Sequence, residues 1–349
     1  MKQINSTLIL LCFLTMATIA NGQNVFDFST FLNASKQDAS NLISGYTAPV
    51  IKAVSYGLTS GWYHTAKTHK KLGVDLGVTL NAVMIPTSDN YFTPPISPTL
   101  NFANNTTPSL QMAPTIVGPK DKTTYMATYN SPLGSQIVDF NGPEGLDFKG
   151  SIGMAVVPVP MAQLGIGLIK NTDLKLRMMP TINNGGNKIS MFGVGLMHDL
   201  KQYLPGVKLL PFDLSVLAGY NSLQGSSNLA SSSAGASNRP SSTDGKVSYT
   251  LNSWVAQLLI SKKLSVLTVY AGVGYGSVST KVNITGTYTI TPTAGASFNI
   301  TDPLAYTMSN TGAKLTAGMR LKLGPIYFNG DYTLQKYNTI SVGFGASIR

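Results

Sequence analysis

The sequence predicts an all-β protein, an antiparallel transmembrane β-barrel of about 12–14 strands with an N-terminal amphipathic helix. Three observations lead to this fold class: long segments that alternate apolar and small polar residues, a low content of charge, and an export signal. Charged residues make up 11% of the 349 residues, whereas a soluble domain carries about 25%. Hydrophobic residues stay at 43%, so the chain is poor in charge without being apolar enough for helical membrane spans.

Residues 1–22 are predicted to be the export signal. Lys2 gives a positive start, Leu8–Ala20 is a short apolar core, and Gly22 is a small residue before the expected cleavage point. A membrane-spanning helix needs about 20 apolar residues, so this segment is too short to be one. The only cysteine, Cys12, lies inside it. The mature protein should therefore contain no disulfide and no thiol ligand for a metal.

Residues 23–52 are predicted to form an amphipathic helix that acts as a plug. Apolar side chains recur at three- and four-residue spacing, which is the pattern of a helix with one apolar face. These residues are Phe28, Phe31, Leu32, Ala39, Leu42, Ile43 and Tyr46. Gly45 or Pro49 should end the helix. Because the helix leads directly into the first strand, we expect it at the barrel mouth or in the lumen rather than free in the periplasm.

Residues 53–349 are predicted to form the barrel, and Lys71–Ile85 shows the pattern most clearly. Leucine, valine and other apolar residues alternate there with Gly, Asp, Thr and Asn, as in a strand with one apolar face. The segment is more than twice as long as the usual strand of about 5–6 residues. Such a strand suits a tilted membrane crossing with lipid on the apolar face. Similar alternation recurs in Ala162–Ile169, Leu174–Pro180, Pro211–Tyr220, Lys246–Ile260, Leu264–Ile290, Ala313–Leu323, Ile326–Gln335 and Thr339–Arg349.

A soluble antiparallel sandwich is the alternative, because its strands also alternate. Its polar face would carry many charges, but here that face is mostly Gly, Ser, Thr and Asn, and Glu144 is the only glutamate. Five tyrosines assigned to apolar faces favour the membrane barrel, where aromatic girdles mark the interfaces. They are Tyr220, Tyr249, Tyr270, Tyr288 and Tyr332.

Loop lengths predict the topology, if the C-terminus is periplasmic as in bacterial barrels. The short turns at Gly324–Pro325, Ser261–Lys263 and Asn171–Asp173 are then periplasmic, and Asn221–Gly245 and Thr291–Asn310 face outward. Counting strands back from the C-terminus in the same way places Pro86–Pro143 on the periplasmic side. That assignment changes if the insert contains two further strands, which would raise the count from twelve to fourteen.

The polar faces predict a lumen with excess positive charge. Charged groups on the lipid face cost about 2–4 kcal/mol at the bilayer centre, which favours inward positions or strand ends. The candidate lumen-lining residues are Asp75, Lys175, Arg177, Asp213, Lys314, Arg320, Lys322 and Asp331, and Lys281 is assigned to the same face. If a pore is open, this excess should favour anions.

No catalytic, cofactor or metal site is predicted, and the protein is not expected to be an enzyme. His64 and His69 have no nearby Cys or Glu, so surface histidines are the favoured interpretation over metal ligands. His198-Asp199 could orient a Ser nucleophile, but a turn at a strand end explains the pair more simply. Gly272, Gly274 and Gly276 precede no strand-to-helix switch, so small residues facing the lumen are favoured over a phosphate loop.

The net charge of +11 raises nucleic-acid binding as a possibility. The basic residues are scattered, however, and no Lys/Arg run with interleaved aromatics occurs. We therefore expect no nucleic acid as a partner. Outer-membrane lipid, lipopolysaccharide and a small anionic solute are the expected partners.

Three blocks, Gly61–Leu76, Gln163–Pro180 and Lys201–Tyr220, resemble an uncharacterised outer-membrane β-barrel family of Bacteroidota. Some members are distantly similar to long-chain fatty-acid transporters of the FadL type, which also begin with an N-terminal plug. The resemblance implies a location in the bacterial outer membrane. It also implies a channel or transporter for a small amphipathic or anionic solute. The alternative is a binding or assembly protein that does not transport and has a plugged lumen.

Overall fold

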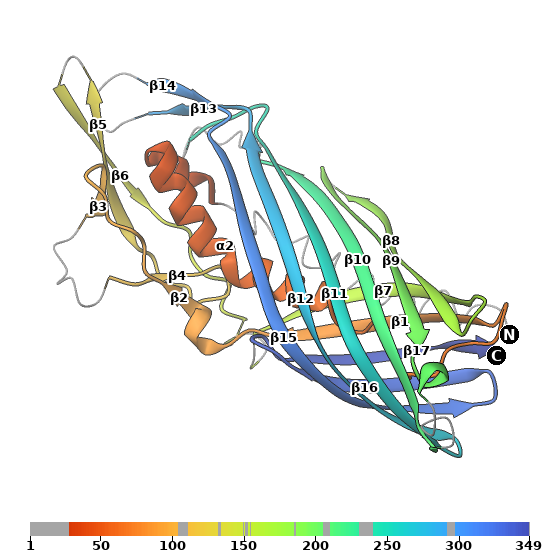
Figure 1. Ribbon diagram of the computed structural model, residues 1–349. Helices are drawn as coiled ribbons and strands as arrows, with labels where there is room; N and C mark the ends of the chain where they lie inside the picture. Colours follow the sequence, from red (N-terminus) through yellow and green to blue (C-terminus); the bar gives the residue numbers. More distant parts are fainter. Residues whose placement is uncertain are drawn as a thin grey trace, which may run out of the picture.

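The computed structural model is a closed antiparallel barrel with a long helix in its wide mouth (Figure 1). The structure describes residues 28–103, 111–131, 134–148, 150, 153, 155–184, 186–204, 210–229, 240–291 and 297–348. The predicted export signal, residues 1–22, lies outside the described residues. The barrel, the antiparallel pairing and the N-terminal helix confirm the predicted fold class.

Ten strands form the barrel, and each pairs with two antiparallel neighbours. In chain order they are β1 (Val74–Met84), β7 (Val156–Gly167), β8 (Thr172–Asn184), β9 (Asn187–Asp199), β10 (Asp213–Asn228), β11 (Lys246–Leu264), β12 (Leu267–Thr285), β15 (Leu304–Leu323), β16 (Ile326–Leu334) and β17 (Thr339–Ile348). β1 closes the ring between β17 and β7. The predicted count of 12–14 is too high, because long segments are single strands: β15 alone has 20 residues.

The two ends of the barrel differ, and we name them by their connections. At the turn end, short connections such as Ser265–Val266 and Gly324–Pro325 join the strands. At the loop end lie the described residues of three longer connections: 85–103, 111–131, 134–148, 150, 153 and 155; 229 and 240–245; and 286–291 and 297–303. The predicted turn at Ser261–Lys263 is wrong in position, because these residues continue β11.

The insert after β1 lies at the loop end, so its predicted place on the side of the short turns is wrong. Nine barrel strands follow the insert, an odd number, so it lies at the opposite end from the C-terminus. Its own short strands pair with one another and not with the barrel. β3 (Leu100–Phe102), β5 (Thr124–Ser131) and β6 (Gly134–Asn141) form one sheet, and β2 (Tyr91–Phe92) pairs with β4 (Ala113–Pro114). A further pair, β13 (Thr287–Ile290) and β14 (Phe298–Thr301), stands at the same end (Figure 1).

The helix α2 (Lys36–Leu58) follows a short 3₁₀ turn, η1 (Phe28–Asn33), and continues past both predicted stops. Pro49 lacks the N–H that would bond to the carbonyl one turn earlier. Beside this break, the Tyr46 carbonyl accepts a hydrogen bond from the Ile116 amide of the insert (3.0 Å). This tertiary bond lies one residue from the break, and the helix runs on to Leu58. Neither α2 nor any other described helix has the length and apolar content of a membrane span.

The outer wall carries an apolar band bounded by a row of aromatic side chains. Tyr220, Trp254 and Tyr275 lie on neighbouring strands and are exposed, and the Trp254 and Tyr275 rings are 5.9 Å apart. Of the five predicted girdle tyrosines, Tyr220 and Tyr332 are exposed on the outer wall. The assignment is wrong for Tyr270 and Tyr288, which are buried, and Tyr249 packs against the interior cluster.

Candidate functional site

The C-terminal end of α2 lies in the barrel lumen, where two buried cations bind its last carbonyl groups. The Arg177 guanidinium donates to the carbonyls of Leu58 (3.3 Å) and Ser60 (3.0 Å). The Lys314 ammonium donates to the Thr59 carbonyl at 2.6 Å. A helix C-terminus has unpaired carbonyls and a partial negative charge, so cations stabilise it. Arg177 and Lys314 are therefore occupied by the helix end.

Amide side chains from three further strands complete this ring around the helix end. Asn81 donates to the Gly57 carbonyl (3.1 Å), Asn221 to the Leu58 carbonyl (2.9 Å), and Gln163 to the Trp62 carbonyl (3.3 Å). The donors come from β1, β10 and β7. With Arg177 on β8 and Lys314 on β15, five strands hold the segment Gly57–Trp62 inside the lumen. This segment and the chain that follows it to Leu72 form what we call the plug.

Trp62 lies in the lumen next to the helix end, on the side of the turn end, and glycines in the wall make room for its ring. The Arg177 guanidinium lies 3.8 Å from the centre of the Trp62 ring. A Cβ atom at Gly195 or Gly219 would come within 2.8 Å of the indole. Glycines at these inward positions are thus required by the plug, and no other residue fits without displacing the ring.

Nearer the turn end, His69 of the plug joins Asp173 of β8 and Ser347 of β17. The His69 Nδ1 atom lies 2.8 Å from an Asp173 oxygen, and its Nε2 atom lies 3.3 Å from the Ser347 hydroxyl. The order Ser-His-Asp is that of a hydrolytic triad. Ser347 is only 1% exposed, however, so its hydroxyl cannot meet a substrate in this arrangement. We interpret the three residues as an anchor that fixes the plug to two strands.

His64 forms a second anchor with Asp75 of β1. Its Nε2 atom lies 3.3 Å from Asp75 Oδ1, which also accepts a hydrogen bond from the Tyr327 hydroxyl (2.9 Å). The Arg320 guanidinium lies 3.8 Å from the same carboxylate and 4.2 Å from the Tyr327 ring centre. The predicted surface position of the histidines is wrong, because His64 is 7% and His69 3% exposed. The sequence contains no sign of these contacts, because Asp173 and Ser347 lie more than 100 residues from His69 and the pairing of His64 with Asp75 follows no motif.

The other predicted lumen residues also lie on inward positions of their strands. Lys175 is buried, Asp331 accepts a hydrogen bond from the Tyr270 hydroxyl (3.0 Å), and Lys322 donates to the Ser347 carbonyl (2.8 Å). Asp213 is half-buried at the turn end of β10. Lys281 is exposed on the outer side of β12, so its assignment to the lumen face is wrong.

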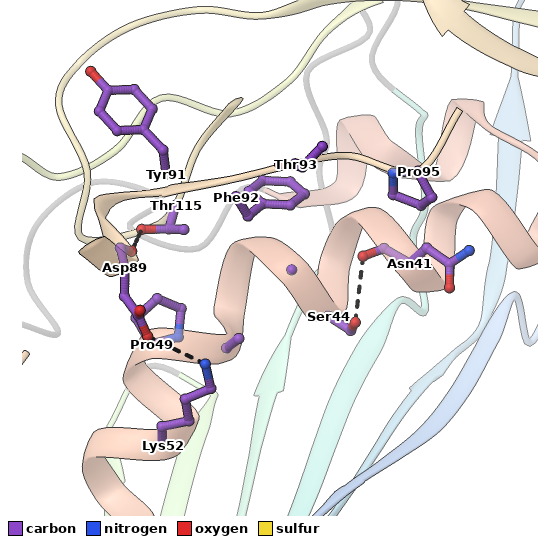
Figure 2. Close-up of a pocket in the computed structure, with 12 residues that line it drawn as sticks. Asn41, Ser44, Pro49, Lys52, Asp89, Tyr91, Phe92, Thr93, Pro95 and Thr115 are labelled. Atoms are coloured by element: carbon purple, nitrogen blue, oxygen red, sulfur yellow. Dashed lines mark hydrogen bonds and ion pairs between the residues drawn. The ribbon is translucent and has the colours of Figure 1, made fainter. Parts of the chain in front are cut away.

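The loop end contains a groove of about 470 Å³ between α2 and the segment that follows β1. Figure 2 shows Asn41, Ser44, Pro49 and Lys52 on the helix side, with Phe92 lying over the helix. Facing them are Asp89, Tyr91, Thr93, Pro95 and Thr115. The helix wall therefore carries an amide, a hydroxyl, a proline and a lysine, and the facing wall carries two aromatic rings, a proline, two threonines and the Asp89 carboxylate.

Lys52 and Asp89 close one end of the groove with an ion pair at 3.3 Å. The Tyr337 hydroxyl donates to the same Asp89 carboxylate. Burial alone would raise the pKa of Asp89, but the Tyr337 hydrogen bond and the Lys52 ammonium hold this pKa below its ordinary value. Burial and the hydrogen bond to Asp89 raise the pKa of Tyr337. Asp89 is thus a carboxylate that links the helix, the insert and the β16–β17 loop.

The groove was not predicted, because its walls come from segments about fifty residues apart with no motif in either. Over the described residues, no group of three or more His, Cys, Asp or Glu side chains is arranged to hold a metal ion. His198 contacts Thr172 and Tyr203 at a strand end, which agrees with the turn interpretation.

Comparison with solved structures finds bacterial outer-membrane barrels at low similarity. The Ail attachment invasion locus protein of Yersinia pestis shares 6% identity over 80% of this chain and 98% of its own, with a TM-score of 0.26. The outer-membrane protease OmpT of Escherichia coli shares 9% over 83% and 97%, with a TM-score of 0.26. The outer-membrane channel DcaP of Acinetobacter baumannii shares 12% over 81% and 100%, with a TM-score of 0.19.

These neighbours differ in activity and the scores are low, so no activity is transferred from them. No curated protein matches the chain. The similarity to FadL-type transporters and the origin in Bacteroidota stay predictions. A family model described as "Family of unknown function (DUF6588)" matches residues 1–348, and the chain belongs to that family.

Proposed function

We propose that the protein is an outer-membrane barrel with a closed lumen that binds a ligand at its loop end. The observation that carries the proposal is the plug, which is hydrogen-bonded to strands on several sides of the lumen. Cations and amides of five strands bind Gly57–Trp62, and the Ser261 and Ser215 side chains bind the Ala66 backbone at 3.0 and 2.6 Å. A plug held along its whole length leaves no permanent path for solutes.

The energy of these contacts supports a stable plug. Hydrogen bonds to charged groups contribute about 1.5–3 kcal/mol each, and Arg177 and Lys314 together make several to the helix end. Moving the plug out of the lumen would break all of these bonds together. Spontaneous opening should therefore be rare.

A location in the outer membrane fits the outer wall. On β15 the apolar band runs from Leu323 to Ala313, a length of about 25 Å at the usual strand rise and tilt, which is the height of such bands in outer-membrane barrels. An export signal at residues 1–22 would deliver the chain across the inner membrane. The C-terminus would then place the turn end in the periplasm and the groove outside.

The groove supports a small amphipathic ligand. The Phe92 ring with Pro49 and Pro95 offers apolar surface, while Asn41 and Ser44 offer an amide and a hydroxyl. Binding sites commonly combine mostly apolar walls with a few placed polar groups. The predicted small amphipathic solute is thus retained as a ligand, but at the loop end and not in a pore.

A disulfide between plug and wall tests the closed lumen. A Cβ atom at position 276 would lie 3.3 Å from the Thr59 Cβ atom, close to the 3.5–4.5 Å typical of disulfides. The double variant Thr59→Cys, Gly276→Cys should be silent in planar bilayers when oxidised and when reduced. A steady conductance in the wild type, or one that appears on reduction of the variant, would support the competing function, transport through a movable plug.

Filling the groove tests ligand binding separately. Native mass spectrometry of protein extracted from its own membranes should detect a small bound molecule in the wild type. The variant Ala48→Trp, which places an indole in the groove, should lose it. Ala305→Trp, on the exposed outer side of β15, is the matched control and should retain it. Equal retention by both variants would exclude the groove as the site.

A further inference from the structure

The turn end carries a concentration of positive charge at its surface. Six exposed lysines lie there, in the plug exit and in the tips of two hairpins: Lys67, Lys70, Lys71, Lys170, Lys262 and Lys263. None of the described acidic residues at this end is exposed, because Asp75 and Asp173 are buried and Asp199 and Asp213 are half-buried. A surface of one sign attracts a partner of the opposite sign.

Exposed aliphatic side chains accompany these lysines in every one of the three segments. Leu72 follows Lys71 and is 76% exposed, and Ile169 precedes Lys170 and is 63% exposed. Leu264 and Val266 are exposed directly after Lys262 and Lys263. Basic side chains mixed with exposed leucine and isoleucine are typical of segments that lie at a lipid headgroup surface.

The loop end lacks this combination. Its exposed lysines are interspersed with the exposed carboxylates Asp121, Asp139, Asp244 and Asp302. The mixed charge leaves no surface of one sign among the described residues there. The loop end also exposes apolar side chains such as Ile96 and Ile137, so the difference between the ends lies in the sign of the charge that surrounds them.

We infer that the turn end binds anionic phospholipid headgroups of the adjoining leaflet. The lysines would contact lipid phosphates, and Leu72, Ile169 and Leu264 would enter the boundary between headgroups and acyl chains. An acidic soluble protein could satisfy the charges, but it would leave no reason for an aliphatic residue beside each basic segment. The geometry thus points to phospholipid as the partner of this end.

Spin-labelled lipids test this inference on the full-length protein. In phosphatidylcholine vesicles containing labelled phosphatidylglycerol, the wild type should select the anionic lipid over labelled phosphatidylcholine by about fivefold, the effect of roughly 1 kcal/mol near a membrane surface. The selectivity should fall as salt rises, because salt screens the attraction. The variant with Lys70, Lys71, Lys170, Lys262 and Lys263 all changed to Gln should lose it.

A second variant tests whether the effect depends on these lysines or only on the total charge of the protein. Changing Lys120, Lys122, Lys188, Lys246 and Lys281 to Gln removes the same number of charges from the loop end and should leave the selectivity unchanged. A gel-mobility shift on boiling shows that both variants are folded. Equal losses in the two variants, or no selectivity in the wild type, would overturn the inference. Capture of polyglutamate by a wild type without lipid selectivity would do the same and point to an acidic protein.

Discussion

The same strands build both halves of the barrel, one near the turn end and one near the loop end. In the first half the apolar side chains face outward, and in the second half they face inward. Along β12, the outward residues Val269, Val273 and Tyr275 are exposed apolar side chains near the turn end. Beyond Tyr275 the outward side becomes polar, and the inward residues Val282 and Ile284 become a buried apolar core. The reversal occurs at the row formed by Tyr220, Trp254 and Tyr275.

The difference shows that a strand can serve two environments without changing its backbone. Near the turn end, the wall is apolar outside and holds a polar plug inside. Near the loop end, it is polar outside and packs against α2 and the insert inside, through residues such as Leu42, Tyr46 and Phe140. The second half is therefore organised like a globular domain, with its apolar residues inside and its polar residues outside.

If this comparison holds, the largest loss of stability should come from removing a side chain from the apolar core near the loop end. Leu42 is fully buried in α2, and Leu→Ala in a core costs about 2–5 kcal/mol. Native-state hydrogen exchange should show that Leu42→Ala lowers the free energy of opening α2 by that amount. Leu258→Ala, on the outer wall near the turn end, is the control and should leave exchange of α2 unchanged. Equal effects would mean that α2 has no core of its own.

A charged residue on the outer wall should destabilise the protein in the half near the turn end and not in the half near the loop end. Met319→Arg places a cation near the middle of the apolar band on β15 and should lower the free energy of unfolding in lipid vesicles by about 2–4 kcal/mol. Asn283→Arg, on the outer side of β12 beyond the aromatic row, should change it by less than about 0.5 kcal/mol. If both changes cost the same, the aromatic row does not mark the membrane boundary.

The polar contacts of the plug should contribute somewhat less to stability than the apolar core and the apolar outer wall do. Arg177→Gln shortens the side chain and removes the charge that binds the helix end, so we expect a loss of about 1.5–3 kcal/mol. The change should appear as faster hydrogen exchange in Gly57–Trp62 and as a shift of Trp62 fluorescence. Lys281→Gln, which removes a cation from the outer wall, serves as the control. Unaltered exchange in the Arg177 variant would show that the helix end does not depend on this cation.

The start of α2 should show a smaller effect that is confined to the loop end. Ser35 is the N-cap, and its hydroxyl oxygen accepts a hydrogen bond from the Asp38 amide at 3.3 Å. Ser35→Ala should destabilise the first turn by about 1 kcal/mol, seen as exchange at residues 36–40. Ser35→Asp keeps an acceptor and should restore most of the protection. Loss of protection around Trp62 in Ser35→Ala would indicate that the two halves unfold together.

The smallest change should be a local opening of the groove at acidic pH. Because the pKa of Asp89 is depressed in the folded state, its contribution is present above the unfolded pKa of about 3.9 and is lost as pH falls through the lower folded pKa. An environment-sensitive dye on Thr93→Cys should report opening of the groove in this acidic range. In Asp89→Asn the same dye should show no such transition. A transition that persists in Asp89→Asn would assign the change to another group.

Much of the barrel could be predicted because its signal is local. Alternation along Val74–Met84 identifies a strand and its two faces without knowledge of any partner, since successive side chains point to opposite sides. The inward position of Asp75, Arg177 and Lys314 follows from the same rule. Their partners could not be predicted, because the carbonyls of Leu58, Thr59 and Ser60 come from a segment with no strand pattern.

The errors have physical causes as well. The insert was assigned to the wrong end because that assignment depends on the exact number of barrel strands that follow it, and the boundaries of long alternating segments do not fix this number. The helix was expected to end at Gly45 or Pro49 because local propensity disfavours both, but burial against the insert and the wall outweighs it. Tyr270 has an apolar ring and was assigned to lipid, whereas its hydroxyl binds Asp331 inside.

By itself, the sequence determined the class of fold, the membrane-facing pattern and the inward placement of most charges, because these depend on neighbours one to four residues away. The tertiary structure alone decided that His64 and His69 are buried anchors, that the insert joins α2 at the loop end, and that the inward cations bind a plug. Each of these depends on contacts across tens to hundreds of residues. Such contacts form only when the barrel closes, because closure brings β1 beside β17 and encloses the chain that precedes it.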